Sequence, residues 1–337
     1  MMDYQMIWFI LITVLFTGFF FLEGFDYGVG MLAPFVSKRE EDRGLILRTI
    51  GPVWDGNEVW MITAGGALFA AFPHVYATMF STFYLALFLM LVALILRGVA
   101  FELRTKEKCP CWQKTWDVAI FIGSIVPAFL WGVAVTDLAA GLPISANMVY
   151  QGNFLDLLSL YSILGGLVFV LVFAYHGAAF LQLRLVDKGL LYRVQDLGKF
   201  AGVCGAIAYV FYLLLTWENT DLLVRPAALG LFIATAVFFL ASLYRFAKAP
   251  GKGSFILGAL AVASVTIGFF TGMFPRLMVS SLNPDWSLTI TNASSTEYTL
   301  SIMTVAALVL VPIVLVYQIW TYYIFRKRVT ASDVSHY

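Results

Sequence analysis

The chain has 337 residues, of which 61% are hydrophobic and 12% are charged, and its mean hydropathy is +0.86. A soluble protein carries about twice that charged fraction, and a net charge of +1 offers no basis for binding nucleic acid. These figures exclude a soluble globular protein and indicate a polytopic membrane protein, with residues 1–337 forming a single integral membrane domain.

Nine apolar runs are long enough to cross a bilayer, which takes about 20 residues. A segment in lipid must satisfy its own backbone hydrogen bonds, so each run is expected to be a helix. We therefore expect an all-α fold with nine transmembrane helices. They cover residues 6–34, 55–73, 76–97, 116–138, 160–182, 200–217, 226–246, 255–275 and 299–325.

The basic residues fall almost entirely on alternate connections between these runs. The connections after runs one, three, five and seven, together with the C-terminal tail, hold 19 Lys and Arg, and the other side holds only Arg225 and Arg276. Basic residues collect on the cytoplasmic side of membrane proteins. This pattern predicts an N-terminus outside, a cytoplasmic C-terminus and a chain without a missed span.

Acidic residues stand where two of the apolar runs approach the predicted cytoplasmic side. Glu23 and Asp26 lie late in the first run. Asp55 and Glu58 begin the second run, within Trp54-Asp55-Gly56-Asn57-Glu58-Val59-Trp60. Each pair is spaced by three residues, which predicts that its members share a helix face. An arginine and a further acid end the third run. The candidate site residues are Glu23, Asp26, Asp55, Glu58, Arg97 and Glu102.

Two explanations fit acids at this depth. Ionisable groups in a membrane segment are costly, so they mark proton routes or other functional sites. The same groups could instead form a structural ion-pair network or be wetted by solvent at the interface. Position alone leaves both open.

The histidines and cysteines are too few for a redox centre. His74 lies in a tight turn, His336 lies in the tail, and His176 alone lies within a span, so there is no intramembrane pair to ligate a bis-histidine haem. Cys109 and Cys111 cannot complete a four-ligand zinc site. We therefore expect no metal and no catalytic group in this chain. His176 is either a hydrogen-bonded packing residue or a polar contact for a proton or a quinone.

Long stretches of the chain resemble subunit II of the cytochrome bd quinol oxidases. The resemblance is carried by Gly24-Phe25-Asp26-Tyr27-Gly28-Val29-Gly30, by the stretch from Trp54 to Trp60 and by its continuation Ile62 to Ala71. It continues in Ser287-Leu288-Thr289-Ile290 and in Tyr317-Gln318-Ile319-Trp320. These blocks occur in order over nearly the whole chain.

The resemblance implies a subunit of a bacterial enzyme of the cytoplasmic membrane that oxidises quinol and reduces oxygen to water. It implies two four-helix bundles plus one peripheral helix, packed against a haem-bearing subunit I. That partner would hold two b-type haems and one d-type haem. A small single-span subunit and a structural quinone are further possibilities, with no binding residues identified for the quinone.

The resemblance also bears on the acids. The family's subunit II is thought to bring cytoplasmic protons towards haem d, and Asp26, Asp55, Arg97 and Glu102 stand at matching positions. Glu23 and Glu58 match less closely. Two other functions stay open: a stand-alone proton-coupled transporter, and a purely structural subunit that conducts no proton.

Overall fold

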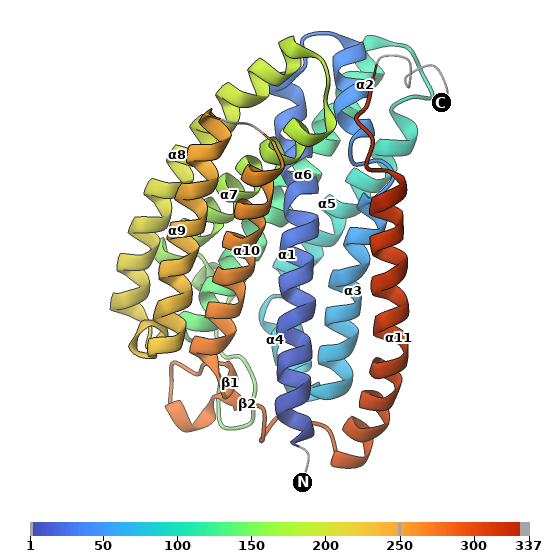
Figure 1. The fold of residues 1–337 in the computed structure, drawn as a ribbon. Coiled ribbons are helices and arrows are strands. Elements are labelled where there is room, and N and C mark those ends of the chain that lie inside the picture. Colours follow the sequence, from blue (N-terminus) through green and yellow to red (C-terminus); the bar gives the residue numbers. More distant parts are fainter. Residues whose placement is uncertain (1–2, 249–250, 331–337) are drawn as a thin grey trace.

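The computed structural model describes residues 3–248 and 251–330 and is built almost entirely from helices that run along one common direction (Figure 1). The α-helices of this part of the chain are α1 (Tyr4–Val36), α2 (Glu40–Arg48), α3 (Trp54–Ala71), α4 (Pro73–Thr82), α5 (Tyr84–Leu103), α6 (Pro110–Ala140), α7 (Leu160–Arg184), α8 (Lys188–Asn219), α9 (Pro226–Lys248), α10 (Lys252–Met273) and α11 (Glu297–Ile324). Short 3₁₀ turns are η1 (Phe154–Leu157), η2 (Leu222–Val224) and η3 (Pro284–Trp286).

Eight of the described helices are long and apolar enough to cross a membrane, which confirms a multi-pass helical membrane protein. They are α1 and α5 to α11. Helix α3 is not among them, because its first turns carry Asp55, Asn57 and Glu58 and lower its hydropathy. The count of nine spans therefore remains a prediction that depends on α3.

The third expected span was placed wrongly. Residues 76–97 do not form one helix, because the backbone leaves the helical conformation at Phe83, where φ is −95° and ψ is 19°. The ten-residue α4 precedes this break, and the long helix α5 runs from Tyr84 to Leu103. Arg97 consequently lies inside α5 and not at its end.

Helix α1 forms the centre of the molecule and packs against α3, α6, α7 and α10 (Figure 1). Its closest approach is to α7, where a Cβ added to Gly28 would lie 1.9 Å from the Phe173 carbonyl oxygen and 2.8 Å from the Cα of Gly177. The two backbones touch because both helices have glycine at this level. Helix α11 lies at the edge, beside α1 and α3.

The connections rich in lysine and arginine gather at one end of the bundle, at the top of Figure 1, which we call the basic end. It comprises residues 37–53, 104–109, 185–187 and 325–330. Polar contacts join these segments: Arg104 pairs with Glu40, and the Val329 amide donates to the Arg184 carbonyl at 2.7 Å. The alternation of basic connections seen in the sequence therefore corresponds to one physical end.

The opposite end adds a small amount of β structure to a fold that was expected to be all-α. Strands β1 (Arg276–Met278) and β2 (Leu288–Thr289) pair antiparallel there. The start of α1 is attached nearby, because Gln5 donates to Ser294 at 2.8 Å. This end thus holds the N-terminal side of α1 and the start of α11 together.

Candidate functional site

A fully buried arginine lies at the centre of the candidate site. The Nη1 of Arg97, in α5, donates to a carboxylate oxygen of Glu23 in α1 and, at 3.4 Å, to Oε1 of Glu58 in α3. Glu23 is also fully buried, whereas 22% of the Glu58 side chain is exposed. One cation therefore binds two acids from two different helices, as buried charge in a membrane segment requires.

A third acid belongs to the same place. Asp26 lies one helical turn after Glu23, is fully buried, and accepts a 2.6 Å hydrogen bond from the side-chain amide of Asn57 in α3. The Oδ1 of Asn57 accepts from the Tyr322 hydroxyl at 2.8 Å and from Gln318 at 3.1 Å, both in α11. We call Glu23, Asp26, Asn57, Glu58 and Arg97 the acid–arginine cluster.

The cluster is surrounded by rings and retains polar atoms without partners. The Arg97 guanidinium lies 4.8 Å from the centre of the Tyr27 ring and 5.7 Å from that of Phe101, distances at which a cation is attracted to a π face. Among the described residues, no partner is found for Glu23 Oε2, Asp26 Oδ1, the Tyr27 hydroxyl or two guanidinium nitrogens of Arg97. Buried polar atoms normally have partners, and five of these atoms lie in or beside this one cluster.

Glycine makes room for the arginine. A Cβ on Gly123 of α6 would lie 2.5 Å from the Arg97 Cβ and 2.6 Å from the Ala93 carbonyl oxygen. Helices α5 and α6 can approach so closely only because this position has no side chain. The guanidinium is thereby fixed deep within the bundle.

Two of the residues expected in the site lie outside the cluster. Asp55 and Glu102 are exposed, and each lies near the basic end of its helix. The buried face of α3 is formed by Asn57 with Ala64, Leu68 and Ala71, whereas Glu58 lies at its edge and Asp55 is exposed. Asp55 lies on the side of α3 that Glu58 shares and is close enough to Arg97 and Glu102 to interact with their charges, but no hydrogen bond or ion pair joins it to the cluster among the described residues.

His176 contacts α1 and not the cluster. Its Nε2 lies 3.2 Å from the Phe21 carbonyl oxygen, and its ring stacks on Phe255 with centroids 4.8 Å apart. The ring is 1% exposed. These contacts are those of a packing residue, and a role of His176 as a polar contact for a proton or a quinone stays a prediction.

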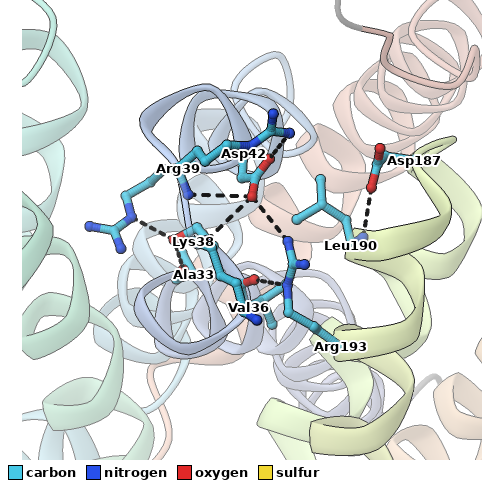
Figure 2. Close-up of polar contacts among 10 residues, drawn as sticks. Ala33, Val36, Lys38, Arg39, Asp42, Asp187, Leu190 and Arg193 are labelled. Atoms are coloured by element: carbon cyan, nitrogen blue, oxygen red, sulfur yellow. Dashed lines mark hydrogen bonds and ion pairs between the residues drawn. The ribbon is translucent and has the colours of Figure 1, made fainter.

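A second set of charges ties the corner between α1 and α2 to α8 (Figure 2). Asp42 accepts hydrogen bonds from the backbone N–H groups of Lys38 and Arg39 and from the side chains of Arg39 and Arg193. Arg193 also donates to the Val36 carbonyl oxygen at 2.5 Å. Burial alone would raise the pKa of Asp42, but these donors outweigh it and hold that pKa below its ordinary value.

The same end carries a second ion-pair group on the other side of α2. Asp117 of α6 binds Arg43 and, at 2.7 Å, Arg104, which also pairs with Glu40 at 2.7 Å. These charges link α2, α5 and α6. They are structural ties close to water, in contrast to the acid–arginine cluster deeper in the bundle.

The site includes residues that sequence analysis had not selected, namely Asn57, Gln318, Tyr322 and Tyr27. Two signals could have indicated them. Asn57 shares a helical face with the small residues of α3, and Gln318 and Tyr322 are polar residues four apart in a run that is otherwise apolar.

Two of the three histidines, His74 and His176, lie within the described residues. No group of three or more His, Cys, Asp and Glu side chains within residues 3–248 and 251–330 is placed to hold a metal. His176 uses Nε2 on a backbone carbonyl, His74 is exposed in the first turn of α4, and His336 lies outside the described residues.

The fold and the site together define a multi-pass helical membrane protein with a cluster of ionisable side chains buried near one end. The sequence matches the family "Cytochrome bd terminal oxidase subunit II" over residues 4–325. It is 43% identical to cytochrome bd ubiquinol oxidase subunit 2 of Bacillus subtilis, over 98% of both chains. It is 36% identical to cytochrome bd-I ubiquinol oxidase subunit 2 of Escherichia coli, over 99% of this chain and 98% of the relative.

The fold is also similar to that in the structure of bd oxidase from Geobacillus thermodenitrificans. The TM-score is 0.76 at 16% identity, over 96% of this chain and 97% of the other. The chain belongs to the cytochrome bd terminal oxidase subunit II family. It is a subunit of an oxidoreductase complex that contains haem and includes a partner subunit I, and it lies in a bacterial membrane.

Proposed function

We propose that this chain is the non-haem subunit of a quinol:oxygen oxidoreductase and that its acid–arginine cluster carries protons from the cytoplasm towards the site of oxygen reduction. Quinol as substrate is supported by the names of the relatives, which are ubiquinol oxidase subunits. The haems, two b-type and one d-type by resemblance, would be held by subunit I. A bound structural quinone and a small single-span subunit remain open expectations.

The observation that carries the proposal is the charge balance of the cluster. Three acids lie near one cation: Arg97 of α5 contacts Glu23 of α1 and Glu58 of α3, and Asp26 of α1 is close enough to interact with its charge. Three ionised carboxylates would leave two buried negative charges without a cation, and each would cost several kcal/mol. The cluster is therefore stable only if it binds protons, which is the property required of a proton carrier.

The exposure of the acids decreases from the basic end inwards. Asp55 and Glu102 are exposed, Glu58 is partly exposed, and Glu23 and Asp26 are fully buried. This order supports a route in which surface acids collect protons and Glu58 passes them to the buried pair. Arg97 Nη1 contacts both Glu58 and Glu23, so it holds the two carboxyls side by side.

The direction of the route depends on topology. We propose that α3 is the ninth span, that the N-terminus is outside, that the basic end faces the cytoplasm and that the helices form two four-helix bundles with α11 as the peripheral helix. The gathering of basic connections at one end supports this orientation. Protons taken from that side for oxygen reduction would contribute to a proton gradient.

The haem of the partner would supply the redox chemistry when bound. The residues of this chain would hold and transfer protons: Glu58 at the edge of the cluster, Glu23 on the guanidinium, and Asp26 through Oδ1, the oxygen that has no partner among the described residues. Asn57 would hold the other oxygen of Asp26 in place.

The proposal is tested with Asp26→Asn and Asp55→Asn in the assembled complex reconstituted in lipid. Positioned proton transfer contributes factors of about 10²–10⁴, so we expect Asp26→Asn to lower quinol-driven oxygen consumption by at least about tenfold. Asp55→Asn should have a smaller effect, because Glu102 remains near it on the exposed side. Glu41→Gln, an exposed acid of α2, is the control and should retain the wild-type rate.

The other two functions predict different results. Wild-type oxygen consumption in both aspartate variants, at normal haem content, would favour a purely structural subunit. Purification of the chain without any haem absorption, under conditions that keep membrane complexes intact, would favour a stand-alone transporter.

A further inference from the structure

The half of α11 nearer the basic end has an unusual distribution of polarity. Its outward positions are apolar and exposed, including Ile313, Val316 and Ile319, each more than 60% accessible. Gln318 and Tyr322, which are polar and spaced by four, point inward to the bundle. The inward face of this half therefore includes two side chains that are held by hydrogen bonds.

The attachment of α11 differs between its two ends. Near the opposite end Leu300 and Thr304 are buried, and the Trp8 indole donates to both at 3.2 and 3.0 Å. Near the basic end Tyr322 packs against the apolar core, and the described hydrogen bonds are those of Gln318 and Tyr322 to Asn57 and that of Arg184 to a backbone carbonyl. The main polar target of this half of α11 is therefore one amide.

We infer that Asn57 is a positioning residue for Asp26 and that α11 sets its orientation through Gln318 and Tyr322. Two donors occupy the amide oxygen of Asn57, so its nitrogen must face the carboxyl of Asp26, which accepts at 2.6 Å. If the amide rotated by half a turn, its oxygen would face a carboxyl oxygen, and two acceptors would oppose each other. The inference rests on the proposed function, since it concerns the same carboxyl.

The neighbours of Asp26 make this control specific. The charged and titratable groups around it are Glu23 and Tyr27 of α1, Glu58 of α3, Arg97 of α5 and Tyr322 of α11. The guanidinium of Arg97 donates to Glu23 and Glu58, whereas Asn57 donates to Asp26. A change in Asn57 should therefore alter Asp26 while leaving the arginine pairs in place.

The experiment removes the two donors separately and together. Tyr322→Phe and Gln318→Leu each leave one donor on Asn57, and the double variant leaves none. Tyr323→Phe is the matched control, because the neighbouring tyrosine is exposed and its cation–π contact with Arg326 does not need the hydroxyl. Each complex is compared for quinol-driven oxygen consumption, haem content and the infrared difference band of the Asp26 carboxyl, identified by its loss in Asp26→Asn.

Loss of a hydrogen bond in a buried network costs enough to change a rate by about three- to tenfold. We expect about a threefold loss of rate in each single variant and at least about tenfold in the double variant, with a shifted carboxyl band and normal haem content. Tyr323→Phe should match the wild type in all three measurements.

Two results separate the failure of this inference from that of the proposed function. A wild-type rate and band in the double variant, while Asp26→Asn loses both, would show that α11 does not position the carboxyl although the carboxyl matters. A wild-type rate in Asp26→Asn would overturn both proposals. Should the double variant not assemble, the shift of the band in the two single variants decides, since a purely structural role of α11 would leave that band unmoved.

Discussion

The strongest consequence of the site geometry concerns the coupling between Arg97 and Glu23. Both side chains are fully buried, and the guanidinium donates to the carboxylate. Replacing Arg97 by glutamine leaves that carboxylate and Glu58 without their cation, which by analogy with other broken buried pairs should cost about 3–5 kcal/mol. Replacing Glu23 by glutamine leaves a buried guanidinium whose remaining acidic partner among the described residues is Glu58, at 3.4 Å.

The double variant Glu23→Gln/Arg97→Gln removes both charges. Its loss of stability should therefore be smaller than the sum of the two single losses, by about 2 kcal/mol or more. The assay is thermal denaturation of the solubilised complex, together with the yield of assembled complex per unit of membrane. A control cycle uses Asp221 and Arg276, an exposed pair at the opposite end, whose coupling should be below about 1 kcal/mol.

Additive losses in the Glu23–Arg97 cycle would refute the reasoning. They would mean that the two charges are each compensated by other groups and that the charge balance of the cluster does not depend on their contact.

Three further outcomes follow from other parts of the structure. Gly28→Ala should prevent assembly or lower stability by several kcal/mol, because the added Cβ would overlap the α7 backbone. Gly44→Ala is the control and should be neutral or slightly stabilising, because the space around Gly44 is open. The yield of assembled complex distinguishes the two outcomes. Asp42→Asn should destabilise the basic end by about 1–3 kcal/mol at neutral pH, as measured by hydrogen exchange in α2. Since the folded-state pKa of Asp42 is lowered, its contribution is present above the unfolded pKa of about 3.9 and is lost only as pH falls through the lower folded value, so variant and wild type should still differ at about pH 4 and converge only below the folded pKa; a difference that has already vanished at about pH 4 would contradict this. Trp8→Phe should loosen only the far end of α11, seen as faster proteolysis near residue 300 without a change in the Asp26 carboxyl band.

Hydropathy predicted the long helices well, because a segment in lipid has little choice but to be helical. It failed at Phe83, where apolar residues continue on both sides of the break and the average hydropathy carries no sign of it. The run that forms α3 was predicted as a span like the others, although its polar start gives this helix a lower hydropathy.

The acids were found from sequence because charge in an apolar run is conspicuous. Their arrangement was only partly predictable. The three-residue spacing of Asp55 and Glu58 predicted one shared face, but it gave no sign that Asn57 would define the buried face of α3 while Asp55 stays exposed. The hydrogen bonds from Gln318 and Tyr322 to Asn57 join residues more than 260 positions apart in the sequence. A single sequence contains no information about which residues pair at that separation.

The touching backbones of Gly28 and Gly177 limit how the buried acids can move. With no side chains between them, α1 and α7 interlock, and sliding one along the other would drive the Phe173 carbonyl into the next residue of α1. Asp26, two residues from Gly28, is thus kept at a constant depth. On the proposed function, protons would pass this carboxyl by rotation of side chains and by transfer over short distances, while α1 and α7 keep their relative positions.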